Sequence, residues 1–267
     1  MKIGVFDSGL GGLTILKGLI NGLPEYDYVY LGDNARVPYG GRSPEIIYEF
    51  TKNAVDFLLQ KNCQLVILAC NTATSTSLKK IQQEYLPKKY PDRRVLGVIK
   101  PAVERAAELK SKKIGVIGTY ATVNSEAFVH ELQKLSPKPE IFQQACPLLV
   151  PIIEEAEIEW EGLRLILQKY LKMLSNHGID SLILGCTHYG LIQKNIQAVV
   201  GDRVKIISEG EETAKKLKEY FKKHSEIEKN LSKQSFRELY VTDYNSRYQK
   251  MADWFLGQHN KLVMVNI

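Results

Sequence analysis

The feature that most constrains the fold of this chain is an alternation between short apolar runs and longer segments of helical periodicity. Continuously apolar runs are typical of parallel strands, because helices cover both faces of a parallel sheet. We therefore predict an α/β fold with right-handed crossovers. The predicted strands are Lys2–Phe6, Tyr28–Gly32, Gln64–Ala69, Val95–Ile99, Lys113–Gly118, Glu140–Ala145, Ser181–Gly185, Val204–Ile207 and Leu239–Thr242.

One helix is especially clear, between the second and third predicted strands. Ser43 suits its cap and Pro44 its first turn. Apolar residues then fall on a single stripe: Ile46, Ile47, Phe50, Ala54, Phe57 and Leu58. Such a stripe predicts a helix that packs one face against a sheet.

The sequence also repeats itself. Segments resemble one another in the same order in both halves: Lys2–Phe6 and Lys113–Ile117, Val37-Pro38 and Val150-Pro151, Leu65–Cys70 and Ser181–Cys186. Apolar strands look alike by chance, but the shared order of the segments and the cysteine at the same place in each half favour a true repeat. We predict two similar parallel-sheet α/β domains, residues 1–97 plus 208–267 and residues 98–207, with the active site in the cleft between them.

Size and charge exclude several classes of protein. A chain of 267 residues with 44% apolar and 25% charged residues has ordinary globular composition. Its longest apolar run, Leu65–Cys70, is far short of the ~20 residues that span a bilayer. We see no signal peptide and expect a cytoplasmic protein with no membrane partner. The net charge of +6 is mild. The lysines of segment 215–223 are interleaved with Glu219 and followed by Glu226 and Glu228, as on a solvated helix face, so no nucleic-acid partner is expected.

Four cysteines are present, and two of them are candidates for chemistry. No Cys-x-x-Cys pair or zinc spacing occurs, so we expect free thiols and no metal site. Cys70 and Cys186 each end an apolar strand and precede small polar residues and a predicted helix, Ser75–Tyr85 and Tyr189–Val199. Ligands gather beyond the carboxyl ends of such strands, and a helix N-terminus lowers the pKa of a thiol. The alternative is that both thiols are inert core residues, which the matched pair disfavours.

The first strand leads into Asp7-Ser8-Gly9-Leu10-Gly11-Gly12. The dinucleotide fingerprint would need a glycine at Thr14, so neither a nicotinamide nor a flavin cofactor is indicated. Asp7 would repel a pyrophosphate, but it is suited to orient an ammonium group or to assist a nearby thiol. A tight turn with a helix cap would explain the glycines but not the aspartate.

Other polar groups are expected at the same sheet edges. Val37-Pro38-Tyr39-Gly40 follows the second strand, and Val150-Pro151 with Glu154 occupies the matching place in the second half. His188 lies two residues after Cys186, and with Glu154 it is a candidate to move protons. Thr119 and Thr122 follow the first strand of the second half, where their hydroxyls can bind a carboxylate or Thr122 can cap the following helix.

Taken together, these motifs resemble the bacterial glutamate racemases. The resemblance rests on Asp7-Ser8-Gly9 with Gly11-Gly12, Val37–Gly40, Ala69–Ala73, Val150-Pro151 with Glu154, and Gly185–Tyr189, with a weaker match at Glu212–Ala214. It implies cofactor-independent interconversion of L- and D-glutamate, which supplies D-glutamate for peptidoglycan. It also implies Cys70 and Cys186 as the acid/base thiols, and Asp7, Glu154 and His188 as assisting groups. The implied substrate contacts are Asp7, Ser8, Tyr39, Gly40, Asn71, Thr72, Thr119, Thr122, Thr187 and His188. We expect glutamate as the small-molecule partner and a homodimer.

The chain departs from the family pattern in places that leave the catalytic groups intact. Gly190 stands where proline is usual, Lys100 where many members have glutamate, and Thr74 where serine is usual. The common Asp-Ser-Gly appears as Ser208-Glu209-Gly210. Two other functions stay open: an aspartate racemase, which typically has glutamate at the place of His188, and a non-catalytic bilobal binding module. A pyridoxal phosphate enzyme is disfavoured, because no lysine stands at a strand end beside these motifs.

Overall fold

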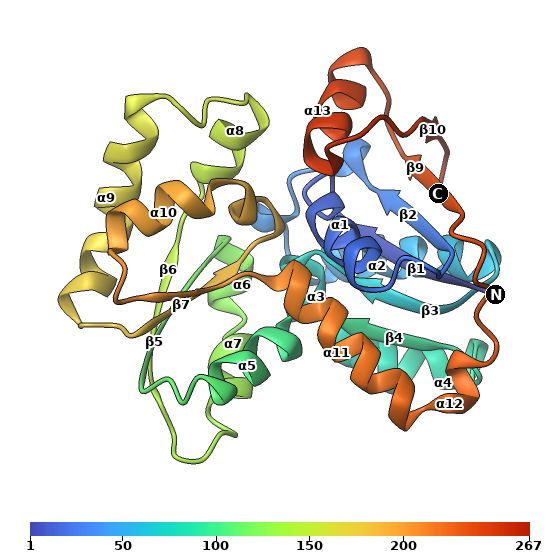
Figure 1. The fold of residues 1–267 in the computed structure, drawn as a ribbon. Coiled ribbons are helices and arrows are strands. Elements are labelled where there is room, and N and C mark those ends of the chain that lie inside the picture. Colours follow the sequence, from blue (N-terminus) through green and yellow to red (C-terminus); the bar gives the residue numbers. More distant parts are fainter.

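The computed structural model describes residues 1–267 and contains two all-parallel sheets (Figure 1). The first sheet has six strands in the order β10-β9-β2-β1-β3-β4, and the second has four in the order β6-β5-β7-β8. The strands of the first sheet are β1 (Lys2–Asp7), β2 (Tyr28–Gly32), β3 (Cys63–Leu68), β4 (Arg94–Gly97), β9 (Arg237–Val241) and β10 (Leu262–Met264). Those of the second are β5 (Lys113–Gly118), β6 (Glu140–Ala145), β7 (Ser181–Gly185) and β8 (Lys205–Ile207).

The predicted α/β class is confirmed, and every predicted strand exists with small shifts at its ends. The largest shifts are at β4, where Ile99 already belongs to the following helix, and at β9, which begins at Arg237 rather than Leu239. Strand β10 was not predicted from the sequence. It is three residues long, and two of them are exposed, so it lacks the continuous apolar run that marks the buried strands.

The internal repeat is visible in the strand order. The run β2-β1-β3-β4 in one sheet has the same topology as β6-β5-β7-β8 in the other. In both, the order reverses beside the first strand of the half, so that β1 and β3, like β5 and β7, flank a topological switch point. Ligands of open α/β sheets bind at such points, outside the carboxyl ends of the strands.

Helices cover both faces of both sheets, as the apolar strands require. On the first sheet, α1 (Leu13–Gly22), α11 (Glu209–Lys223) and α13 (Ser246–Leu256) enclose one core, and α2 (Pro44–Gln60) and α3 (Asn71–Lys80) enclose the other. On the second sheet, α8 (Leu149–Glu154), α9 (Glu161–Asn176) and α10 (Gln193–Val200) lie over one face, and α5 (Ile99–Glu108) and α7 (Ala127–Leu132) lie over the other. The remaining α-helices are α4 (Leu86–Lys89), α6 (Tyr120–Asn124) and α12 (Ser225–Glu228), and the short helices are η1 (Asn34–Arg36), η2 (Tyr39–Gly41), η3 (Ile81–Tyr85) and η4 (Thr187–Ile192).

Two helices test local sequence predictions. Helix α2 begins as predicted, with Ser43 accepting a hydrogen bond from Ile46 N and Pro44 in its first turn. Helix α11 carries the lysine-rich segment, in which Lys215, Lys218, Lys222 and Lys223 are exposed. Lys216 is half-buried and pairs with Glu108 of α5 and with Glu219. No helix of the structure is long and apolar enough to cross a membrane. Both chain ends lie on the six-stranded side (Figure 1).

Candidate active site

The two switch points bring the predicted cysteines to equivalent places. Cys70 lies two residues beyond the end of β3, beside the end of β1 at Asp7. Cys186 follows the last residue of β7, beside the end of β5 at Gly118. Two contacts between the halves lie near the carboxyl ends of these strands. They join Asp7 to Thr187 and Thr72 to Thr119. The repeat therefore presents one thiol from each half to a shared region.

Cys70 is held by the start of α3. Its sulfur caps that helix by accepting from Ala73 N at 3.4 Å, and its thiol donates to Ser8 Oγ at 3.4 Å. The side chain is only 5% exposed. Burial, followed by the charge of Asp7, raises the pKa of the Cys70 thiol to about 11. The hydrogen bonds from Ser8 and Ala73 oppose this shift but do not cancel it.

Cys186 has a different local environment. The helix predicted over Tyr189–Val199 is instead the 3₁₀ helix η4, followed by α10 from Gln193. The Cys186 sulfur makes no cap bond, but it lies 3.8 Å from Nδ1 of His188, whose Nε2 is 3.1 Å from Oε1 of Glu154. Thiol, imidazole and carboxylate thus form a relay. The two predicted proton-handling groups follow the sulfur in space, first His188 and then Glu154.

The expected lowering of the thiol pKa values by helix N-termini is wrong for both cysteines. Burial raises the pKa of Cys186 well above its ordinary value, as it does for Cys70. A negative charge on Cys70, Asp7 or Glu209 would add to the effect at Cys186. The cost of ionising a thiol away from water exceeds the gain from the short η4 helix or the capped α3 helix.

Asp7 lies close enough to both thiols for its charge to act on each of them. It is almost fully buried, and it accepts from Gly9 N at 3.0 Å through Oδ2 and from the Thr187 hydroxyl at 3.4 Å through Oδ1. Burial raises the pKa of the Asp7 carboxyl, while the nearby His188 acts in the opposite direction. A carboxylate whose pKa is raised is a better proton acceptor, which suits the predicted assisting role.

The glycines after Asp7 allow side chains to approach closely. A Cβ on Gly11 would lie 2.4 Å from the ring of His188, and one on Gly12 would lie 2.4 Å from Cβ of Asp7. The two glycines therefore serve opposite sides of the site. Gly11 makes room for the Cys186 relay, and Gly12 makes room for the aspartate beside Cys70.

Threonine hydroxyls form a second junction between the halves. Thr72 Oγ1 lies 2.9 Å from Oγ1 of Thr119, which is itself 3.0 Å from that of Thr122. Gly40 packs here too, since a Cβ on it would lie 2.8 Å from Thr119. The cap of α6 is Thr119 and not Thr122 as predicted, because Thr119 Oγ1 accepts from Thr122 N at 3.2 Å.

Tyr39 is placed differently from the other predicted contacts. It is buried, and its hydroxyl donates to Asp33 Oδ2 at 2.5 Å, where Arg36 also pairs. Burial, with the adjacent charge of Asp33, raises the pKa of Tyr39 above its ordinary range. The hydroxyl is thus engaged in holding η1 and η2 together, and Asp33 is a structural partner that the sequence analysis did not identify.

Glu209 was also missed. The side chain of Glu209 is 3% exposed, and its carboxyl accepts from Nδ2 of Asn71 at 2.6 Å. Asn71 is the residue that follows Cys70 in the chain. Burial raises the pKa of Glu209 well above its ordinary value. The signal was present in the departure Ser208-Glu209-Gly210, but nothing in the sequence shows that this glutamate turns inward.

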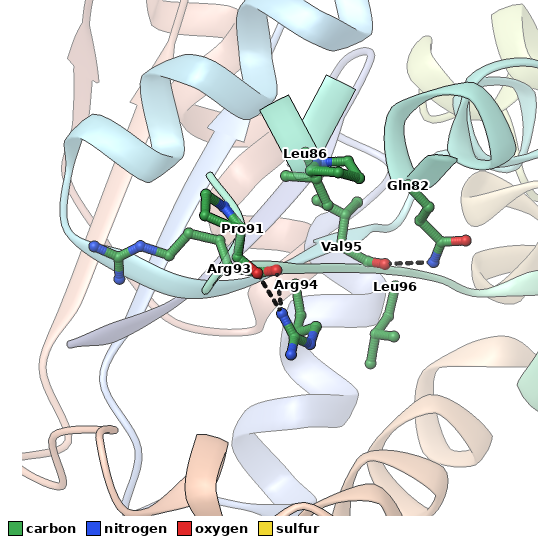
Figure 2. Close-up of a pocket in the computed structure, with 8 residues that line it drawn as sticks. Gln82, Leu86, Pro91, Arg93, Arg94, Val95 and Leu96 are labelled. Carbon is green, nitrogen blue, oxygen red and sulfur yellow. Dashed lines mark hydrogen bonds between the residues drawn. The ribbon is translucent and has the colours of Figure 1, made fainter. Parts of the chain in front are cut away.

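Two of the cavities in the structure border the sheets at β8 and at β4. One, of about 560 Å³, lies between α1, η4, β8 and the start of α11, and its lining includes Cys186, Thr187 and Glu209. Figure 2 shows the other, of about 390 Å³, at the edge strand β4, where Gln82 donates to the carbonyl of Val95. None of the predicted site residues lines this second cavity. The structure contains no group of three or more His, Cys, Asp or Glu side chains arranged to hold a metal ion.

Comparison with known proteins now gives the family. The model of the Asp/Glu/hydantoin racemase family matches residues 4–217, which include every predicted site residue. The chain therefore belongs to this family of racemases.

The relatives narrow the assignment. Glutamate racemase of Aquifex aeolicus is 40% identical over 97% of this chain and 95% of its own length. The structure of glutamate racemase isoform RacE1 from Bacillus anthracis matches with a TM-score of 0.90 at 35% identity, covering 100% of this chain and 97% of that one. The structure of glutamate racemase from Francisella tularensis, in complex with D-glutamate, matches with a TM-score of 0.88 at 34% identity. The match covers 99% of this chain and 97% of that one. Within its family, the chain falls among the glutamate racemases, which are isomerases.

Proposed function

We propose that this chain interconverts L- and D-glutamate by proton transfer between the α-carbon and two thiols, Cys70 and Cys186. Racemisation requires a base on one face of the α-carbon and an acid on the other, because the planar intermediate must be reprotonated from the opposite side. In each direction one thiolate takes the α-proton, and the other thiol donates its proton to the opposite face. The observation that carries the proposal is the equivalent placement of the two thiols at the switch points of the two sheets.

The assisting groups follow from the contacts of each thiol. His188, oriented by Glu154, receives the proton of Cys186 when that thiol becomes the base. Asp7 has the same task at Cys70, and its raised pKa favours proton uptake. Both are general-base roles in which geometry comes first and pKa second.

The raised thiol pKa values indicate when ionisation occurs. Without substrate, both thiols are neutral at pH 7, because burial raises their pKa values. The α-ammonium of glutamate brings a positive charge into the site, and an opposite charge lowers the pKa of a neighbouring thiol. Substrate binding therefore favours the thiolate that removes the α-proton. The backbone N–H groups at the start of α3 are suited to hold the negative charge that develops on the α-carboxylate.

The residues expected to hold glutamate are those that the family resemblance implies. They are Asp7, Ser8, Tyr39, Gly40, Asn71, Thr72, Thr119, Thr122, Thr187 and His188. The D-glutamate complex of the Francisella tularensis relative supports glutamate as the ligand. Supply of D-glutamate for peptidoglycan is the physiological role that the family implies.

We also propose the division into domains 1–97 plus 208–267 and 98–207, with the site in the cleft between them. Strand membership supports it, because β9 and β10 pair in the first sheet after the chain leaves β8. A cytoplasmic location and a homodimer complete the proposal, and sedimentation of the purified protein tests the homodimer.

A racemisation assay by circular dichroism tests the function against both alternatives. L-Glu, D-Glu, L-Asp and D-Asp are supplied in turn, after chelation and without added cofactor. We expect both glutamate enantiomers to racemise and aspartate to be a poor substrate, because its shorter side chain misplaces a buried carboxylate. Equal rates on aspartate would favour the aspartate racemase alternative, and no turnover of any substrate would favour the binding module. Activity that a specific metal restores after chelation would contradict cofactor independence.

A further inference from the structure

Glu209 and Asn71 form a buried pair between elements that are distant in the sequence. Glu209 is the first residue of α11, and Asn71 is the first of α3. Their side chains are 3% and 2% exposed, and the Asn71 amide nitrogen donates to Glu209 Oε2 at 2.6 Å. A polar pair so deeply buried must satisfy its hydrogen-bonding groups internally.

One bond leaves two atoms of the pair without partners. Glu209 Oε1 and Asn71 Oδ1 are both buried, and neither has a hydrogen-bond partner. An unpaired buried acceptor is costly, and two oxygens can be joined only by a proton between them. A protonated carboxyl supplies that proton. A carboxylic acid and a side-chain amide are both planar and can share two parallel bonds, N–H to carbonyl and O–H to carbonyl.

The charges around Glu209 agree with a neutral group. Burial raises its pKa, and the negative charge of Asp7 adds to the shift. The cations on the packed helices are engaged elsewhere: Arg105 and Lys215 with Glu212, Lys216 with Glu104, Glu108 and Glu219, and Lys17 with the carbonyl of Phe255. His188 of η4 pairs with Glu154. Lys205 of β8 lines the same cavity as Glu209 but is exposed, and no cation is among the groups that shift the pKa of Glu209.

We propose that Glu209 is a positioning residue of the glutamate site, which as a neutral carboxylic acid holds the Asn71 amide through two hydrogen bonds. This inference rests on the proposed function, in which Asn71 contacts glutamate. The neutral state matters for a second reason, because an ionised Glu209 would place a further negative charge near Cys186 and oppose the formation of its thiolate.

Three variants separate a positioning role from a merely structural one. Glu209→Gln keeps the shape, can form both bonds through its own amide, and cannot ionise. Glu209→Ala leaves both polar atoms of the Asn71 side chain unpaired. The matched control is Glu211→Gln, which removes an acidic side chain from the same first turn of α11 but at an exposed position.

Kinetics in both directions is the first measurement. At pH 7, we expect Glu209→Gln to keep kcat/KM within about threefold of wild type, and Glu209→Ala to raise KM for glutamate by at least about tenfold with a smaller change in kcat. Above neutral pH, the activity of Glu209→Gln should persist further than that of wild type. Glu211→Gln should match wild type throughout. An unaltered Glu209→Ala, or a Glu209→Gln as impaired as Glu209→Ala, would overturn the proposal.

Infrared difference spectroscopy gives a readout that does not depend on activity. The wild-type spectrum at pH 7 should contain a protonated-carboxyl C=O band that Glu209→Gln lacks and Glu211→Gln retains. Absence of such a band in the difference spectrum would overturn the proposal even if Glu209→Ala fails to fold. If instead the band is present but wild type does not racemise glutamate, the proposed function fails and the acid–amide pair stands.

Discussion

The ends of β3 and β7 are equivalent in topology and different in chemistry. Both strands lie beside the first strand of their half, and both lead to a cysteine. Cys70 caps an α-helix and has hydroxyl and amide neighbours, whereas Cys186 opens a 3₁₀ helix and faces an imidazole. The fold repeat therefore fixes where the thiols lie, and in the proposed mechanism the neighbouring side chains determine how each one exchanges its proton.

The difference extends to the adjacent strands. β1 ends at Asp7, while β5 ends at Gly118, so only the first half supplies a carboxylate from its first strand. The second half supplies His188 and Glu154 instead, from η4 and α8. In the proposed mechanism the two bases are both thiols, and this chain assists them with different residue types on the same scaffold.

Replacing either thiol tests the comparison most directly. We expect Cys70→Ser and Cys186→Ser each to reduce racemisation by about 10²–10⁴-fold, because a hydroxyl is far harder to ionise than a thiol. By family resemblance Cys186 serves L-glutamate, so Cys70→Ser should still exchange the α-proton of L-glutamate in heavy water, and Cys186→Ser that of D-glutamate. Proton NMR of the recovered enantiomers measures this exchange.

The control for these variants is Cys63→Ala, at the opposite end of the strand that leads to Cys70. Its activity per folded molecule should equal that of wild type. Near-normal racemisation by either serine variant would mean that the replaced thiol is structural, and the two-thiol mechanism would be wrong.

The two glycines after Asp7 allow each side to be disturbed separately. Gly11→Ala forces a Cβ against His188, and Gly12→Ala forces one against Asp7, both at 2.4 Å. Displacing a catalytic group by about 1 Å can cost about 10²-fold, so we expect losses of about 10- to 100-fold in kcat/KM. Because a racemase equilibrium constant is one, kcat/KM must fall equally in both directions.

Isotope effects reveal which side each glycine variant affects. In Gly11→Ala, removal of the α-proton by Cys186 should become more rate-limiting, so the effect with α-deuterated L-glutamate should rise. In Gly12→Ala, the rise should occur with the D-enantiomer. Gly41→Ala is the control, since its Cβ meets nothing within 4 Å. The same isotope pattern in both variants would contradict the proposal that Gly11 affects the Cys186 side and Gly12 the Cys70 side.

Thiol alkylation compares all four cysteines without substrate. The thiolate is the reactive form, so below the pKa the rate should rise about tenfold per pH unit. Cys70, with a pKa of about 11, should react first, and Cys63 and Cys146, with pKa values of about 12 and no exposure, should lag. Mass spectrometry after iodoacetamide treatment at pH 8, 9 and 10 gives the order. Rapid labelling of Cys70 at pH 7 with a flat pH dependence would contradict its raised pKa.

The same raised pKa values set the pH range of that experiment. A buried neutral thiol contributes its full stability below the unfolded-state pKa of about 8.5 and loses it as the pH rises through the native value. Initial rates are therefore measured while circular dichroism reports a folded chain. Glutamate should slow the labelling of Cys70 and Cys186 and leave Cys63 unchanged.

How much of the structure can be predicted from the sequence depends on which interactions determine each feature. Strand positions and the repeat were predictable, because buried parallel strands need continuous apolar runs. Strand β10 was not, since it is short and half exposed. The helix after Cys186 was misassigned because periodicity does not distinguish a 3₁₀ start from an α-helix.

The chemistry of the site was less predictable than its position. Motifs and family resemblance identified the polar residues, and the structure brings Cys186, His188 and Glu154 together as one relay. The thiol pKa values were predicted in the wrong direction, because burial depends on tertiary packing that no local motif records. Glu209 was overlooked for the same reason, as its inward orientation depends on where α11 packs.

The smallest expected effect concerns the hydroxyl contact between the halves, and a double-mutant cycle isolates it. Thr72→Val and Thr119→Val each remove one partner of the 2.9 Å contact. Thr119→Val also removes the cap of α6, which costs about 1 kcal/mol by itself, so only the coupling term is informative. We expect a coupling of about 0.5–1.5 kcal/mol in the free energy of unfolding measured with urea.

The control cycle pairs Thr72→Val with Thr51→Val. The Thr51 hydroxyl bonds within α2, so this cycle should show coupling near zero. If Thr72 and Thr119 turn to glutamate when it binds, saturating glutamate should reduce the first coupling and leave the control unchanged. A coupling that is equal in both cycles would mean that the two halves are not joined through these hydroxyls.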